Sequence, residues 1–175
     1  MPSPVSKAFA VGAALFGGIQ AGVTANRALV LMPAWKRLGV IPWANFIRAE
    51  NHGVGAVFYP AIGLAAVIFP IALAIAFRPD KTQGKSRGLP VYLAAVSVIV
   101  WASITRAVLV PAMFRLQNMT GDALELERIF SLVARWSAVN DALHLITFSL
   151  TIWAVIETFS GANKERVPSS WPISP

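Results

Sequence analysis

The sequence predicts an all-α integral membrane protein folded as a four-helix bundle. Of its 175 residues, 56% are hydrophobic and only 13% are charged, about half the charged share of a soluble domain. Four apolar runs, near residues 8–32, 54–77, 90–113 and 129–159, are each long enough to cross a bilayer. We therefore expect one four-span transmembrane domain over residues 1–160, followed by a disordered tail over residues 161–175 that is rich in proline and serine.

Charge and residue types exclude several classes of function. The net charge is +7, but the basic residues gather at segment ends and in short loops, which is typical of membrane proteins. We expect the lipid bilayer as a partner and no nucleic acid. The chain has no cysteine, which excludes disulfides and thiolate chemistry. With only His52 and His144 available, a three-histidine metal site is impossible within one chain, and we expect no metal.

The first run carries one buried-charge candidate, Arg27, which either snorkels to the membrane surface or lines a cavity. Pro33 and the tryptophan and basic residues after it end this run at an interface. The link that follows, residues 38–51, is amphipathic and leads to His52. Either it forms a solvated helix entrance, or His52 and Tyr59 lie at the mouth of a substrate pocket.

The third run contains Arg106, a cation that needs a partner if it is buried. Asp141 and the side-chain carbonyl of Asn140 are the natural partners, because adjacent antiparallel helices can bring them together. We expect Arg106 and Asp141 to form an ion pair, which either locks the bundle or leaves Arg106 to stabilise negative charge in a site.

The fourth run is the stretch on which the functional argument depends. Trp136, Asn140 and His144 recur at a spacing of four, which places them on one stripe of a helix, with Ser137 and Asp141 beside it. Lipid cannot satisfy such groups. We therefore expect the stripe to face protein or an internal cavity.

Orientation follows from the distribution of lysine and arginine. Seven basic residues lie on the side that holds the termini and the loop at 78–89, against five on the other side. This favours cytoplasmic termini, in an endomembrane if the cell is eukaryotic. The glycosylation sequence Asn118-Met119-Thr120 would then be non-cytoplasmic.

A family resemblance spans nearly the whole chain. The residues that carry it are Gly18, Gly22 and Pro33 in the first run, Trp43, Arg48, Gly53 and Pro60 around the second, Pro111 in the third, and Trp136-x-x-Val139-Asn140 in the fourth. This pattern resembles the anthrone oxygenase family. The sequence departs from it at Leu143, where an arginine is usual, and at Ala112-Met113, where Thr-Asn is common.

The resemblance implies a multi-pass membrane enzyme that oxidises an anthrone-type aromatic polyketide to an anthraquinone with O2, in secondary metabolism. No flavin, nicotinamide or phosphate-binding fingerprint is present, and we expect O2 as co-substrate without a cofactor. His144 is the best candidate base, Asn140 a hydrogen-bond donor to the substrate oxygen and Arg106 a charge stabiliser. Trp136, with Tyr59 and His52, would contact the small aromatic substrate.

Two other classes of protein stay open. One is a glutathione-transferase-like membrane enzyme, indicated by size and by Arg48 and Asn51, although Val54 stands where that pattern has Glu. The other is a non-enzymatic accessory subunit, in which every buried polar residue only locks helices together. The sequence does not determine an oligomeric state.

Overall fold

The structure is almost entirely helical. This computed structural model describes residues 3–77, 88–119 and 122–160, and no strand occurs within these ranges. The predicted disordered tail at 161–175 and most of the basic loop at 78–89 lie outside the described residues.

Within the described ranges, nine helical segments join into five rods. The first rod runs through α1 (Pro4–Asn26), the π-helical η1 (Arg27–Leu31) and α2 (Met32–Leu38), and is followed by α3 (Val40–His52) and α4 (Gly55–Ala76). The next rod runs through α5 (Leu89–Ile104), the π-helical η3 (Thr105–Leu109) and α6 (Val110–Asn118), and the last is α7 (Ala123–Ser160). Four of the rods, all except α3, are long and apolar enough to cross a membrane. The predicted all-α four-span bundle is confirmed, and three of its four helices are longer than the apolar runs.

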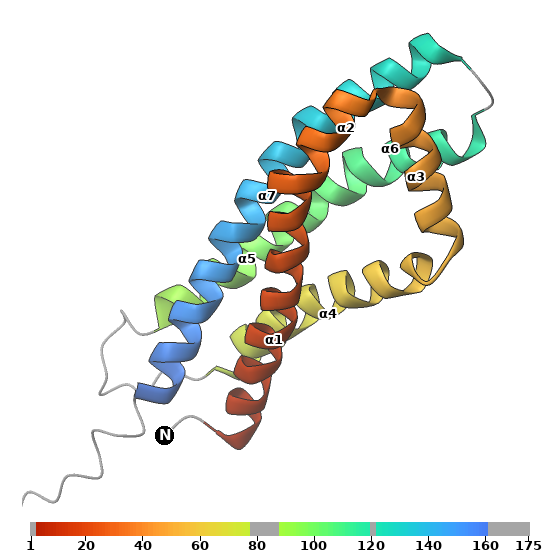
Figure 1. Ribbon diagram of the computed structural model, residues 1–175. Helices are drawn as coiled ribbons and strands as arrows, with labels where there is room; N and C mark the ends of the chain where they lie inside the picture. Colours follow the sequence, from red (N-terminus) through yellow and green to blue (C-terminus); the bar gives the residue numbers. More distant parts are fainter. Residues whose placement is uncertain (1–2, 78–87, 120–121, 161–175) are drawn as a thin grey trace, which may run out of the picture.

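The four long rods form a ring in which each packs on two neighbours. α1 packs on α4 and α7, and α5 packs on the same two helices. α7 runs the length of the molecule, while α4 leans away from the bundle toward its junction with α3 (Figure 1). At Gly12 the contact between α1 and α4 is so close that an added Cβ would lie 2.3 Å from the ring of Phe69.

Local sequence signals fix several helix ends. The Ser3 side chain accepts a hydrogen bond from the Ser6 backbone N–H, and Pro4 occupies the first turn of α1, where its missing N–H has no cost. Between α2 and α3 the chain turns at Gly39, whose φ of 93° is readily adopted only by glycine. This turn sends α3 back along the outside of the bundle.

Both π-helical segments precede a proline by the same spacing. η1 begins six residues before Pro33 and η3 begins six residues before Pro111. A proline ring clashes with the carbonyl four residues earlier in an α-helix, and the wider π turn moves that carbonyl away. π turns of this kind are frequent at functional sites, and here they flank the polar stripe of α7.

Two apolar cores lie at opposite ends of the molecule. The first, here called the cap core, joins α2, α3, α6 and the start of α7; its buried residues are Met32, Trp35, Trp43, Ala44, Ile47, Ala112, Leu116, Leu126, Ile129 and Val133. The second, the base core, joins α1, α4, α5 and the end of α7 through Ala10, Leu73, Val91 and Ala154. The polar stripe of α7 lies between the two cores.

Candidate functional site

The polar stripe of α7 is turned into the protein. Ser137, Asn140, Asp141 and His144 are only 3–5% exposed, because α7 presents this face to α1 and α5. The expectation that this stripe faces protein is confirmed. Trp136, one turn before Asn140, is half-buried.

The cation that pairs with Asp141 is Arg27, from η1. The predicted pair between Arg106 and Asp141 is therefore wrong, as is the predicted contact between Arg106 and Asn140. Arg106 is exposed and has no hydrogen bond or ion pair to another described residue. The neighbouring residue Thr105 faces α7 instead, because successive residues of a helix point in directions about 100° apart.

A chain of hydrogen bonds crosses the bundle from α5 to α1. The Thr105 hydroxyl donates to Asn140 Oδ1 at 3.0 Å. Asn140 Nδ2 lies 3.2 Å from His144 Nε2, and His144 Nδ1 lies 3.3 Å from the Thr24 hydroxyl oxygen. Because the amide oxygen is already an acceptor, the amide nitrogen must donate to Nε2. A neutral His144 then carries its proton on Nδ1 and donates it to Thr24.

The imidazole is also held by an aromatic ring. The rings of Trp101 and His144 have centroids 4.2 Å apart and are inclined by 41°. One turn along α7, Thr147 shares a hydrogen bond with Ser97 of α5. We refer to Thr24, Arg27, Trp101, Thr105, Asn140, Asp141 and His144 together as the His144 network.

One donor of this network is not used. The Nε atom of Arg27 is buried and has no hydrogen-bond partner among the described residues, and the Arg27 side chain as a whole is 29% exposed. Buried donors in native proteins are nearly always paired. A carbonyl or an oxyanion of a bound molecule is the kind of group that would satisfy it.

Four members of the network were not assigned to a site from the sequence: Thr24, Arg27, Trp101 and Thr105. For Arg27 the sequence left two interpretations open, and the structure shows its guanidinium group paired with Asp141 while 29% of the side chain is exposed. A usable signal was present, since Arg27 and Thr105 each stand six residues before a proline in an apolar run.

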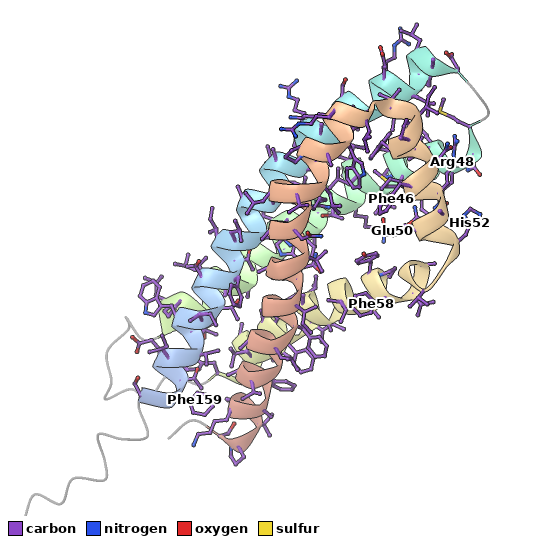
Figure 2. The ribbon with its side chains drawn as sticks, viewed as in Figure 1. Phe46, Arg48, Glu50, His52, Phe58 and Phe159 are labelled. Atoms are coloured by element: carbon purple, nitrogen blue, oxygen red, sulfur yellow. The ribbon has the colours of Figure 1, made fainter. Side chains whose placement is uncertain are left out.

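Tyr59 and His52 do not join the network through any hydrogen bond among the described residues. The Tyr59 hydroxyl donates to Glu50 at 2.8 Å, and His52 Nδ1 donates to the Arg48 carbonyl at 2.6 Å. Both residues are exposed near the corner between α3 and α4. Figure 2 shows Glu50 on the inner side of this corner and His52 on its outer side. The predicted joint role of His52 and Tyr59 at a pocket mouth is not supported by this geometry.

The described residues contain no group of three metal-binding side chains. His52 and Glu50 belong to α3, whereas His144 and Asp141 belong to α7, so the four do not form a two-histidine carboxylate set. Asn118 is exposed at the last residue of α6, and Thr120 of its sequon lies outside the described ranges.

No family model, curated protein or solved structure matches this chain. The fold and the site define its class: a four-span α-helical membrane protein with a buried network of histidine, asparagine and an arginine–aspartate pair.

Proposed function

We propose that this protein is a membrane oxygenase that converts a flat aromatic substrate of the anthrone type to the corresponding quinone with O2. The observation that carries the proposal is the buried imidazole of His144, hydrogen-bonded to Asn140 at 3.2 Å and to Thr24, which lies one turn before the cation Arg27. The resemblance to anthrone oxygenases suggested Asn140 and Trp136, and the chemistry of a base suggested His144. Arg27 takes the place that the sequence had suggested for Arg106.

The reaction needs a base, an oxyanion stabiliser and an apolar surface. A base removes a proton from the methylene carbon between the two aryl rings, and the electron pair spreads onto the ring oxygen. The carbanion then reduces O2 and forms a carbon–oxygen bond. Loss of water from the resulting hydroperoxide gives the new carbonyl, so that one CH2 group and one O2 become one C=O group and one H2O.

The network offers groups for each of these tasks. His144 Nε2 is occupied by the Asn140 amide in the structure, so a substrate that reaches the imidazole must displace this hydrogen bond. The released amide can then donate to the substrate oxygen. Arg27, with its unused Nε–H, would stabilise the negative charge on that oxygen, while Trp101 and the half-buried Trp136 offer aromatic surface.

A second function, a non-enzymatic accessory subunit, is favoured by a different observation. Among the described residues, Arg27 Nε is the only buried side-chain nitrogen or oxygen of the His144 network without a hydrogen-bond partner. A network so nearly complete would also serve as a lock that holds α1, α5 and α7 in register.

Substituting His144 by two different residues distinguishes these functions. His144→Gln keeps an amide that can accept from Asn140 and donate to Thr24, but it cannot act as a base. His144→Phe loses both properties. For the oxygenase we expect O2 consumption with emodin anthrone to fall by about 10²–10⁴ in both variants, the usual contribution of a general base.

If the protein is instead a non-enzymatic accessory subunit, we expect no substrate-dependent O2 consumption in the parent. His144→Gln should then keep the thermal stability that His144→Phe loses. Ser149→Ala is the matched control, because the Ser149 hydroxyl is exposed and bonds only the Leu145 carbonyl of its own helix. Turnover by His144→Gln at the parental rate would remove His144 from the mechanism.

We also propose that both termini are cytoplasmic. The short segment 78–87 carries four basic residues and one acid, and it connects the same end of α4 and α5 at which α1 begins. Protease added to sealed cytoplasmic-side-out vesicles should remove the tail after Ser160. A protected tail, with cleavage in the link between α2 and α3, would reverse the orientation.

A further inference from the structure

The length of helix between the charged residues at the base of the bundle and the His144 network is close to the thickness of the hydrocarbon core of a bilayer. Arg27 follows Lys7 by 20 residues and Asp141 precedes Glu157 by 16 residues, which correspond to about 30 Å and about 24 Å of helix. Arg106 lies about 26 Å along its rod from the start of α5. The hydrocarbon core of a bilayer is about 30 Å thick. If the charged residues at the base of the bundle mark one surface of the bilayer, Arg27, Arg106 and Asp141 would lie near the other.

With a membrane surface at this level, the helices beyond it would form a cap outside the hydrocarbon. The cap contains α2, α3, α6 and the start of α7, and it has its own apolar core. These segments gather at the end of the molecule opposite the N-terminus (Figure 1). α7 has 38 residues, about 57 Å of helix, which is nearly twice what a bilayer requires.

A repeated sequence pattern relates the two rods that carry Arg27 and Arg106. Residues 27–38 read Arg-Ala, four residues, then Pro-Ala-x-x-Arg-Leu, and residues 106–116 read Arg-Ala, three residues, then the same ending. The rods occupy equivalent places in the ring, since each packs on both α4 and α7. Arg27 has the carboxylate of Asp141 as its partner. Arg106 is exposed and has no described partner.

We propose that Arg106 binds the phosphate of a phospholipid headgroup at this surface of the membrane. A guanidinium group matches a phosphate through paired N–H donors. The rod brings Arg106 to within a few Å of the depth of the headgroup phosphates, which a long arginine side chain can reach, and the side chain is exposed, so its donors are accessible. An oxygenase and a structural subunit would both have this site.

The placement of the cap can be tested by labelling, because the natural chain has no cysteine. Ile41 of α3 and Val96 of α5 are equally exposed, at 57% and 58%, but only Ile41 belongs to the cap. In nanodiscs, a water-soluble maleimide should label Ile41→Cys and leave Val96→Cys unlabelled. Equal protection of both would place α3 within the hydrocarbon and overturn the inference.

The lipid site itself is tested by counting the phospholipid that the detergent-purified protein retains, by mass spectrometry. Arg106→Gln should retain about fivefold less, the equivalent of about 1 kcal/mol per cation at a membrane surface, and Arg106→Lys should stay close to the parent. Arg115→Gln is the matched control, since Arg115 is an exposed cation farther along the same rod, in the cap. Unchanged retention in Arg106→Gln contradicts the proposal.

Millimolar inorganic phosphate, added during purification, separates the two sources of phosphate. We expect it not to displace the lipid. If it lowers retention by the parent to the level of Arg106→Gln, the site is one for free phosphate, and the assignment to a lipid headgroup is wrong.

Discussion

At the scale of single residues, the pair formed by Arg27 and Asp141 dominates the polar layer. Removing one partner of a buried pair strands the other charge, which costs about 3–5 kcal/mol when burial is complete. Because Arg27 is 29% exposed, we expect a smaller loss for Asp141→Leu, about 1–3 kcal/mol. The double variant Arg27→Met with Asp141→Leu should lose less than Asp141→Leu alone. Thermal unfolding of the purified protein in detergent measures all three.

Arg128→Ala serves as the control for this prediction. Arg128 and Glu125 are 3.7 Å apart on one face of α7, and their side chains are 71% and 35% exposed. Pairs of this kind contribute about 0.3–0.5 kcal/mol. If the double variant is less stable than Asp141→Leu, the cost of Asp141→Leu does not come from the unpaired charge of Arg27, and the prediction is wrong.

At the scale of elements, α3 holds the end of α6 through one side chain. Arg48 Nε donates to the Leu116 carbonyl at 3.1 Å, and one of its terminal nitrogens donates to the Met119 carbonyl at 2.8 Å. Carbonyls at a helix end lack partners within the helix, and hydrogen bonds to a charged donor are worth about 1.5–3 kcal/mol each. The two bonds together would contribute about 3–6 kcal/mol. Because Arg48 is only half-buried, we expect Arg48→Ala to lower the unfolding free energy by less, about 2–4 kcal/mol.

Amide hydrogen exchange at residues 113–119 should rise in Arg48→Ala, because the end of α6 loses its contact to α3. Arg48→Lys should recover only part of the stability, since an ammonium group does not reproduce the fork of a guanidinium. Exchange that is unchanged in both variants would mean that α6 is held by its apolar contacts alone.

At the scale of the whole molecule, the two cores should respond differently to the same substitution. If the cap lies in water, its core is stabilised by burial of apolar surface. In the base core lipid chains replace water, so only packing is lost. Leu116→Ala, in the cap core, should lower stability by about 2–5 kcal/mol. Leu73→Ala, in the base core, should cost less than half of that.

Leu116 and Leu73 are a matched pair, because their exposed fractions are 0% and 2%. Thermal unfolding in lipid bicelles provides the comparison. Equal losses from the two substitutions would mean that both cores have the same surroundings, and the cap would then lie within the bilayer.

The sequence by itself determined the class of fold and the face of α7 that is buried. Long apolar runs must form helices in lipid, since only helices and barrels satisfy the backbone there. A stripe of Asn140, Asp141 and His144 in such a helix must turn inward for the same reason. These two predictions follow from the solvent and require no knowledge of which helices are neighbours.

Only the tertiary structure decided which cation pairs with Asp141. Arg27 and Arg106 lie at similar depths in two rods that both pack on α7. The residues around them in the sequence also follow nearly the same pattern, so the sequence did not distinguish them. The two arginines differ in the direction in which each side chain points around its helix axis. The π turns η1 and η3 change the direction of the residues at this level, and they present Arg27 from one rod and Thr105 from the other. Because a single residue of helix rotates a side chain by about 100°, packing alone determined which of the two arginines entered the site.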